Sequence, residues 1–592
     1  MSRWISHIAF FLSGVLVISR IWVAEDAYIT FRVVENLFYG AGLVYNPGEN
    51  IEAYSHPLWM MLLVVIRTAG VPLHMGSILL GGGLVIFALG FLIYSKNPGN
   101  DFTFPAAVLL LTAISGFRDF STGGMEFSLV FFLLCVFFIS LSKYSLKEHP
   151  AFFSSLLALL YLTRPELGLL LPWYSIFFIK EVYDENIKEK IKVKSALLKF
   201  IQWIYPVLLW AGGYHLFRFY YFNDFFPNTY YAKSGLSTYY SQGFKYLLYT
   251  LIWSPGFIFL TLFPFLFLAA KKWKLFTITT DTRTIIRDTG AAYLLAFYII
   301  RLGGDFMSFR FLLPEAAILA LAFHNFMIKD DKNLSAFLKK KIELIIPFIK
   351  KYPNLYSPLL VLILFLFSFW PVPASKGFVG DERNHYMKDM ENTSLLSLLT
   401  SQSHPWGRSG KNYEELQECL QYNDFWITNS QSQAKCMQGV GLGYFGVNAG
   451  PGVKILDEQA LPNREVALMP VRLRFRPGHE HFLNLSDVIH KGVLFCSSGE
   501  PAYDRIMKTR AGILIRLDPA LLETVPDIQS RLKRLIELKK QKSNIIPRLE
   551  SRYNVKIEDL YLQSSRWEKN SFLKQKNQCW ENFKGNDEGF FY

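Results

Sequence analysis

Long apolar blocks separated by short polar segments dominate the N-terminal part of the chain. A helix that crosses the hydrocarbon of a bilayer needs about 20 residues, and several blocks reach that length. The blocks at 103–115, 151–162 and 289–302 are shorter and need flanking residues to span. The pattern predicts an α-helical polytopic membrane protein with about eleven transmembrane helices. The eleven blocks are residues 5–23, 76–94, 103–115, 125–142, 151–162, 166–179, 199–217, 246–270, 289–302, 311–328 and 357–373.

The apolar pattern also predicts where the chain divides. No comparable block occurs after residue 374, so we expect a transmembrane domain at 1–373 and a soluble domain at 374–592. The second region is long enough for a core of its own, of α/β or α+β class. Residues 5–23 could be a signal peptide, but the run is long and lacks an Ala-x-Ala site, so we interpret it as an uncleaved first helix.

The distribution of basic residues predicts the topology. With a cytoplasmic N-terminus and alternating spans, Lys and Arg concentrate in the inward loops, as the positive-inside rule requires. The protein would lie in the inner (plasma) membrane as a multi-pass protein, with its C-terminal domain in the periplasm. This bias accounts for much of the net charge of +14. A nucleic-acid partner is therefore not expected.

The cysteines agree with that topology. Cys135 lies in an apolar block, whereas Cys419, Cys436, Cys496 and Cys579 all follow residue 374. An even number in a domain outside the cytoplasm is typical of disulfides, and proximity favours Cys419–Cys436 with Cys496–Cys579. Four free buried thiols are the alternative. No cysteine or histidine pair has the spacing of zinc ligands, so no metal site is predicted.

The first outward loop, residues 24–77, contains the most unusual polar sequence. Glu25 and Asp26 are adjacent acids placed where the first helix should leave the membrane, in the stretch VAEDAYITFR. Apolar positions over 26–39 predict an amphipathic helix along the membrane surface. The stretch 56–66 is apolar but short, and predicts a second helix that is interfacial or partly embedded.

The other outward loops, at 116–125, 163–165, 218–245 and 301–310, mix charged, aromatic and glycine residues. Ionisable groups near hydrocarbon are costly and usually indicate a function or a paired network. The alternative is that Arg164–Glu166 and Asp305–Arg310 are ion pairs that brace helix ends. These loops and their edges bring charged residues to the same membrane surface, among them Arg118, Asp119, Arg164, Glu166, Asp224, Lys233, Arg301, Asp305 and Arg310.

A carboxylate that faces several cations at a membrane edge fits one reaction class. Asp26 or Glu25 could take the proton from an acceptor hydroxyl, while arginine and lysine hold the phosphate of a lipid-linked sugar. The transition state at the anomeric carbon would resemble an oxocarbenium ion. One base then suffices for a single displacement with inversion. The loops therefore predict a lipid-linked glycosyltransferase.

Seven motifs in order resemble one known family. The chain resembles the GT-C superfamily, and within it the terminal arabinofuranosyltransferases of actinobacterial cell-wall synthesis. The resemblance implies a GT-C fold, a periplasmic active site, a polyprenyl-phosphate sugar donor such as decaprenyl-phosphoryl arabinofuranose, and a cell-envelope glycan acceptor. The motifs are EDAYITFR (25–32) with GLVYNPGENIEAYSHPLW (42–59), STGGMEFSL (121–129), LTRPEL (162–167), FFPNTYYAKSG (225–235), GGDFMSFRFLLP (303–314), GVGLGYFGVNAGPGVKILDEQAL (439–461) and FRPGHEHF (475–482).

The resemblance also implies roles for single residues. Asp26 matches the catalytic base, and Glu25 replaces the first acid of the usual Asp-Asp pair, as a second acid orienting the acceptor or a cation. Asn228, Asp305 and Tyr28 are candidates for the sugar and acceptor. His56, which precedes Pro57, has a structural cap as its alternative. The candidates for the donor phosphate are Arg32, His56, Arg118, Arg164, Lys233 and Arg310.

Several alternatives stay open. A transporter or flippase for lipid-linked sugars would explain the spans and the outward polar groups, but not a carboxylate loop with a large outer domain. A non-catalytic envelope or motility assembly protein, and a lipid-linked sugar ligase or polymerase, are further possibilities. The sugar and the acceptor are not defined by these residues. With enough arginine and lysine, a lipid monophosphate does not require a metal, so no cofactor is expected.

Overall fold

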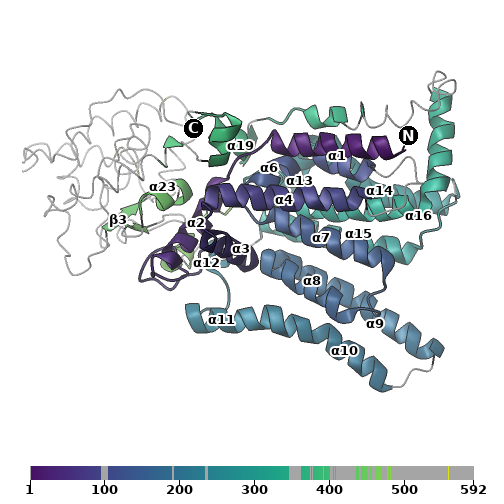
Figure 1. Cartoon of the computed structure of the whole chain (residues 1–592), viewed down its shortest axis with the longest axis horizontal. Coiled ribbons are helices and arrows are strands. Elements are labelled where there is room, and N and C mark those ends of the chain that lie inside the picture. Colours follow the sequence, from purple (N-terminus) through teal and green to yellow (C-terminus); the bar gives the residue numbers. More distant parts are fainter. Residues whose placement is uncertain are drawn as a thin grey trace, which may run out of the picture.

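The protein is described by a computed structural model over most of its N-terminal part. The described residues are 2–94, 105–189, 193–233, 238–275, 277–345, most of 362–407, 435–438, 442–450, 453–456, 460–468, 477–478, 480–481 and a few single positions. Helices make up most of this structure, and many of them lie side by side in one bundle (Figure 1).

The first half of the bundle comprises helices α1 to α8, of which two lie at one end. Helices α2 and α3 lie at one end of the bundle, beside the first turns of α4 (Figure 1). The helices of this half are α1 (Ser2–Ile18), α2 (Glu25–Phe38), α3 (Pro57–Thr68), α4 (Leu73–Tyr94), α5 (Ala106–Ala113), α6 (Ser115–Thr122), α7 (Phe127–Lys143) and α8 (Pro150–Thr163).

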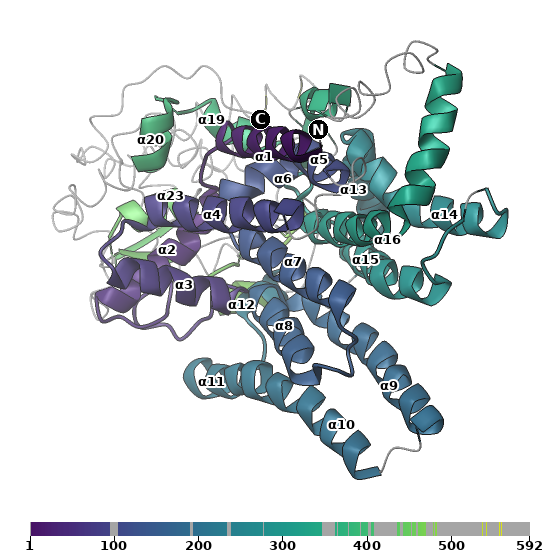
Figure 2. The ribbon, with the colours of Figure 1, turned by 45° about the vertical axis from the view of Figure 1, so that its right-hand side comes forward.

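The second half contains the longest helices. Helices α10 and α11, joined by a π-helical turn, form one rod at the periphery (Figure 2). The elements are η1 (Pro165–Leu169), α9 (Leu170–Glu189), α10 (Val193–Val207), η2 (Leu208–Gly212), α11 (Gly213–Phe222), α12 (Asn228–Ala232), α13 (Tyr240–Ile252), α14 (Pro255–Lys272), α15 (Thr282–Leu302), η3 (Arg310–Leu312) and α16 (Leu313–Ile345).

The core of the bundle lies around the first turns of α16. Residues 316–322 of this helix are all buried, on every side. A helix that is apolar all round belongs in the interior rather than at a surface. Helices α5, α7, α14 and α15 pack around it. This arrangement holds the loop before α16, residues 303–310, firmly against the bundle.

Four described helices are long and apolar enough to cross a membrane: α4, the α10–α11 rod at 193–222, α14, and the segment 310–330. A fifth span results if α6 and α7, bent by 108° relative to each other, count as one. The chain therefore has several membrane helices. The count of eleven stays a prediction, since residues 357–361 and 364 of block 357–373 lie outside the described residues.

Two predicted boundaries are wrong. Residues 116–125 were expected to form a loop, but Ser115–Thr122 forms helix α6, whose residues from Gly116 onward are buried. A buried backbone must satisfy its own polar groups, and a helix does so. Block 246–270 is divided between α13 and α14. Ser254 caps α14 by accepting a hydrogen bond from the Phe257 amide at 3.3 Å, and Pro255 begins this second helix.

Helix α2 confirms the predicted helix over 26–39 but not its surroundings. An amphipathic helix on a membrane surface would expose its polar face, whereas Glu25, Arg32 and Asn36 are buried. Asn36 donates to the carbonyl oxygens of Val44 and Tyr45, both at 2.9 Å. The polar face is covered by residues 44 and 45 and by helix α23 (Leu442–Asn448; Figure 1). Helix α2 is therefore a buried element between two parts of the chain.

The described part of the chain after residue 366 forms short elements. Strands β1 and β2 pair antiparallel, and β3 and β4 pair in parallel. The α/β or α+β class of this domain stays a prediction, as do its disulfides, because Cys419, Cys496 and Cys579 lie outside the described residues. The elements are η5 (Phe367–Phe369), β1 (Ser375–Lys376), β2 (Val379–Gly380), α19 (Glu382–Met387), α20 (Leu395–Thr400), β3 (Lys435–Gln438), α23 (Leu442–Asn448), β4 (Val453–Leu456) and α24 (Arg464–Ala467).

Candidate active site

Asp26 lies in the first turn of α2 and is paired with Arg310, which is distant in sequence and directly precedes α16. Its Oδ2 atom is 2.8 Å from Arg310 Nη1, and the same Nη1 lies 3.7 Å from Asp305 Oδ2. A carboxylate in the first turn is also favoured by the helix dipole. The side chain of Asp26 is 23% exposed. Asp26 is therefore held in place and still open to a substrate.

The backbone before Arg310 explains how this arginine is positioned. Phe309 has φ +67°, an unfavourable conformation for a bulky residue. A Cβ on Gly116 in α6 would collide with the Phe309 side chain. Glycine at 116 thus leaves the space in which the strained turn fits. The turn directs Arg310 toward α2.

A second set of charges surrounds Arg164 at the end of α8. Its Nη2 lies 2.5 Å from Glu166 Oε1, and its Nη1 lies 3.4 Å from Glu126 Oε1. The other oxygen of Glu126 is 3.5 Å from Nδ1 of His56. Thr30, one turn after Asp26 on α2, contacts Nε2 of the same imidazole at 2.8 Å. The burial of His56 lowers its pKa, which favours the neutral ring.

Three cations converge on the ring of Phe311. Lys233 Nζ lies 5.1 Å from its centroid, and the guanidinium carbons of Arg164 and Arg310 lie at 5.1 and 5.6 Å. Desolvation and the neighbouring Arg310 lower the pKa of Lys233. Three of the six predicted phosphate ligands are thus brought together beside Asp26. We call Asp26, Arg164, Lys233, Arg310 and Phe311 the cationic site.

The polar groups at and around the cationic site have unused hydrogen-bonding capacity. Four of their buried atoms have no hydrogen bond among the described residues, although the first three lie 3.4–3.7 Å from an oppositely charged or ionisable group: Glu126 Oε2, Arg164 Nη1, Asp305 Oδ2 and Arg310 Nε. Buried polar atoms in proteins are nearly always hydrogen-bonded, so a cluster of exceptions needs an explanation. A polar ligand that enters between α2 and the 303–310 loop would supply the missing partners.

Glu25 faces away from the cationic site, toward α23. Its carboxylate accepts a hydrogen bond from the Gly443 amide, and the side chain is buried. Burial, together with the charge of Asp26, raises its pKa to about 8. Glu25 is therefore protonated at neutral pH and inaccessible. Of the two adjacent acids, only Asp26 is exposed enough to meet a substrate.

The other three predicted phosphate ligands are not members of the cationic site: His56 borders it through Thr30 and Glu126, whereas Arg32 and Arg118 have other partners. Arg32 donates to the carbonyl oxygens of Tyr45 at 2.9 Å and of Gly450 at 3.1 Å, and also to that of Gly446. Arg118 donates to the carbonyl oxygen of Ser368 at 2.9 Å. Both guanidinium groups thus attach the later part of the chain to the bundle.

The three sugar or acceptor candidates are also divided. Asp305 lies beside Arg310, within the cationic site's surroundings. Asn228 instead donates to the carbonyl oxygens of Ala460 and Leu461, at 2.8 and 2.7 Å. Tyr28 points to the opposite side of α2, where its hydroxyl lies 2.6 Å from Nδ1 of His74. The Asn228 amide group therefore binds the backbone at residues 460–461, so these contacts give no support for a sugar contact.

Sequence reasoning missed Glu126 and Thr30 as members of this neighbourhood. Glu126 links His56 to Arg164, and Thr30 fixes the imidazole from α2. Glu126 belongs to the stretch STGGMEFSL, where a single acid precedes an apolar helix. A single acid at the start of an apolar helix is the sequence feature that could have indicated a buried functional role for Glu126. No group of three or more potential metal ligands occurs among the described residues, and the expected metal independence stays a prediction.

Comparison with known proteins confirms the resemblance seen in the motifs. No protein-family model and no solved structure matches the chain. A 354-residue match to the terminal β-(1→2)-arabinofuranosyltransferase of Mycobacterium tuberculosis has 28% identity and covers 53% of this chain and 54% of that protein. A 348-residue match to the Corynebacterium glutamicum protein of the same name has 27% identity and covers 51% and 47%. The chain thus spans about half the length of the curated relatives it matches, and over that part it is similar to terminal arabinofuranosyltransferases.

Proposed function

We propose that the protein is a membrane glycosyltransferase that moves a sugar, arabinofuranose or a close analogue, from a polyprenyl-phosphate donor to a cell-envelope glycan. One observation carries this proposal. Asp26 is a partly exposed carboxylate held beside three cations, whose surroundings contain buried polar atoms without hydrogen bonds. A base next to a phosphate site is what transfer from a lipid-linked sugar requires.

The residues divide the reaction between them. Asp26 takes the proton of the acceptor hydroxyl as that oxygen attacks the anomeric carbon. The bond from this carbon to the phosphate oxygen breaks, and its electron pair stays on the phosphate. Arg164, Lys233 and Arg310 stabilise the resulting charge through charge-assisted hydrogen bonds. Attack and departure on opposite faces invert the configuration at the anomeric carbon.

Each member of the cationic site has a distinct contribution. Arg310 uses Nη1 to orient Asp26, while its Nε atom has no hydrogen bond among the described residues and is free for the phosphate. Arg164 is fixed by Glu166 and Glu126 on one side. Unlike the two arginines, Lys233 forms no ion pair within 4 Å among the described residues, and it contributes a point charge. Base catalysis contributes about 10²–10⁴-fold, so positioning and phosphate stabilisation supply the rest.

The comparisons support transfer over transport. Both relatives are named for the transfer of arabinofuranose, and the matched region contains about half of each. The sugar, the glycan acceptor and the lipid carrier are part of the proposal, as are the location in the inner membrane and the periplasmic position of the cationic site. No cofactor is needed by the chemistry described.

The test is transfer by the purified full chain in detergent. A short polyprenyl-phosphoryl arabinofuranose and an arabinofuranose oligosaccharide are the substrates, and NMR of the product gives the anomeric configuration. We expect transfer with inversion, and Arg164→Gln should reduce it at least tenfold, whereas Arg283→Gln, in a surface ion pair, should not. Retention would contradict single displacement. No transfer from a panel of lipid-linked sugars would overturn the proposal and favour a transporter.

A further inference from the structure

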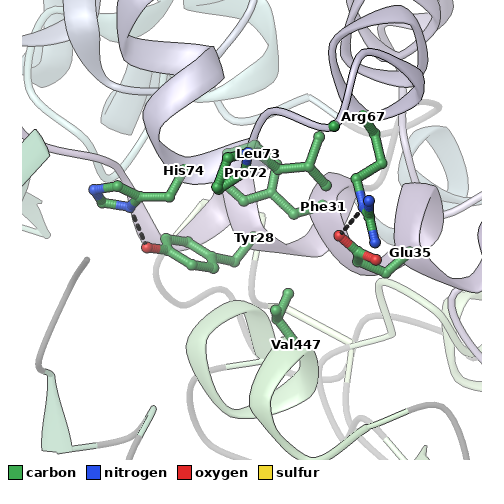
Figure 3. Close-up of a pocket in the computed structure, with 9 residues that line it drawn as sticks. Tyr28, Phe31, Glu35, Arg67, Pro72, Leu73, His74 and Val447 are labelled. Atoms are coloured by element: carbon green, nitrogen blue, oxygen red, sulfur yellow. Dashed lines mark hydrogen bonds and ion pairs between the residues drawn. The ribbon is translucent and has the colours of Figure 1, made fainter. Parts of the chain in front are cut away.

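A cavity lies on the side of α2 opposite to the cationic site. Its volume is about 370 Å³, within the range of small-molecule sites. Tyr28, Phe31 and Glu35 line it from α2, and Val447 lines it from α23. The remaining lining residues come from the end of α3, the loop that follows it and the start of α4 (Figure 3).

Helical geometry separates this cavity from the reaction centre. Residues at positions 28, 31 and 35 follow a spacing of three and four, which places them on one face of α2. Asp26 and Thr30 are four apart and share another face, because two residues along a helix turn by about 200°. Thr30 contacts His56 beside the cationic site. The cavity is therefore close to the base along the chain but not continuous with it across the helix.

The cavity is polar at both ends and apolar in the middle (Figure 3). At one end, Glu35 Oε1 accepts a hydrogen bond from Arg67 Nε at 2.9 Å, and both side chains are partly exposed. At the other end, the Tyr28 hydroxyl meets His74, whose other ring nitrogen lies 2.7 Å from the Leu398 carbonyl oxygen. Phe31 lies between the two ends.

We propose that this cavity binds a stretch of the acceptor glycan that is remote from the sugar being extended. Sugar rings present apolar C–H faces, which match Phe31, and hydroxyls that both donate and accept hydrogen bonds. Glu35 accepts and Arg67 donates at one end, and the Tyr28–His74 pair offers polar atoms at the other. The assignment rests on the proposed function only in taking the acceptor to be a glycan.

The charges argue against an anionic ligand. Arg67 is the one guanidinium among the described residues that line the cavity, and it is already paired with Glu35. A phosphate or lipid headgroup would have to compete with that carboxylate. An acyl chain would bring no hydrogen-bonding groups to the polar ends. A neutral polyol is the class that uses both the ion pair and the apolar middle.

The cavity position also fits a role in acceptor length. In this proposal a long acceptor contacts both the cavity and the cationic site, whereas a short acceptor reaches only the cationic site. The cavity then acts on long acceptors through KM. It leaves the chemical step to Asp26.

The experiment compares two variants with matched controls, using the full chain in detergent. Val447→Trp fills the cavity, and its control is Leu468→Trp at an exposed position. Arg67→Gln breaks the ion pair of the cavity, and its control is Arg283→Gln in another surface ion pair. Binding of an arabinofuranose hexasaccharide is titrated without donor. The KM and kcat for hexasaccharide and disaccharide acceptors are then measured.

We expect both cavity variants to weaken hexasaccharide binding at least tenfold and to raise its KM without lowering kcat, while the controls match wild type. Equal binding by wild type and both variants would overturn the cavity assignment and leave the proposed transfer intact. A fall of kcat with both acceptors would also overturn it, as a structural effect. Cavity-dependent binding without any transfer would support the cavity and contradict the proposed function.

Discussion

Asp26 and Arg310 are 284 positions apart in the chain, and their side chains meet at 2.8 Å. The contact joins the first turn of α2 to the strained turn before α16. It fixes one carboxylate oxygen of Asp26 and leaves the other for an acceptor proton. It also brings a cation to the point where a phosphate would leave. Base and phosphate site are thus positioned by one ion pair.

Glu25→Gln should make stability less dependent on pH. In the folded protein the Glu25 pKa is raised from 4.5 to about 8. Between these values the folded state holds a proton that the unfolded state has lost, so wild-type stability falls as pH rises through this window. Glutamine cannot ionise, and it still accepts the hydrogen bond from Gly443.

Thermal unfolding in detergent across this pH range measures the effect. The melting temperature of Glu25→Gln should decline less than that of wild type. Asp184→Asn changes an exposed acid and should follow the wild-type curve. Parallel curves for wild type and Glu25→Gln would show that Glu25 is not a buried neutral acid.

Gly443→Ala should loosen α23 from α2. A Cβ at this position would collide with the backbone oxygen of Glu25, so the two helices must separate. Overpacking of this kind costs about 1–3 kcal/mol. Transfer should also fall, because α2 carries Asp26. Gly83→Ala in α4, where a Cβ meets nothing within 4 Å, is the control in unfolding and transfer assays. Wild-type stability and activity in Gly443→Ala would refute the close contact.

Lys233 should make donor binding sensitive to alkaline pH. Its pKa lies below the ordinary value of 10.5 because of desolvation and the nearby Arg310. Its positive charge is therefore lost at a lower pH than that of an exposed lysine, and the KM for the donor should rise as pH increases. Lys233→Arg keeps its charge and should flatten the profile. Lys245→Arg, at an exposed position, should leave the wild-type pH profile unchanged. Identical pH profiles for wild type, Lys233→Arg and Lys245→Arg would exclude Lys233 from the phosphate site.

The helices and the polar loops could be predicted from sequence because both are local signals. Apolar blocks indicated α4, α14 and α16, and the amphipathic spacing indicated α2. The ion pairs Arg164–Glu166 and Asp305–Arg310 were foreseen as a structural alternative, and both exist. Each pair contains one arginine of the cationic site, so the same arginine can brace a helix end and bind a ligand.

The partners of individual side chains could not be predicted. Arg32 lies in the same motif as Asp26, but it bonds to carbonyl oxygens of residues more than 400 positions away. Glu52 forms a buried ion pair with Arg218 at 2.5 Å, which neither local sequence indicates. Such contacts depend on how distant segments pack, and the charge of a residue does not reveal its partner.

Asp26→Asn tests the central claim most directly. Transfer from polyprenyl-phosphoryl arabinofuranose to an arabinofuranose oligosaccharide is measured for wild type, Asp26→Asn and Asp26→Glu, with thermal unfolding as the check on folding. A lost base should reduce kcat by about 100-fold or more in Asp26→Asn, with a folded protein and partial activity in Asp26→Glu. An Asp26→Asn variant that retains activity within tenfold of wild type would contradict the assignment of Asp26 as the base.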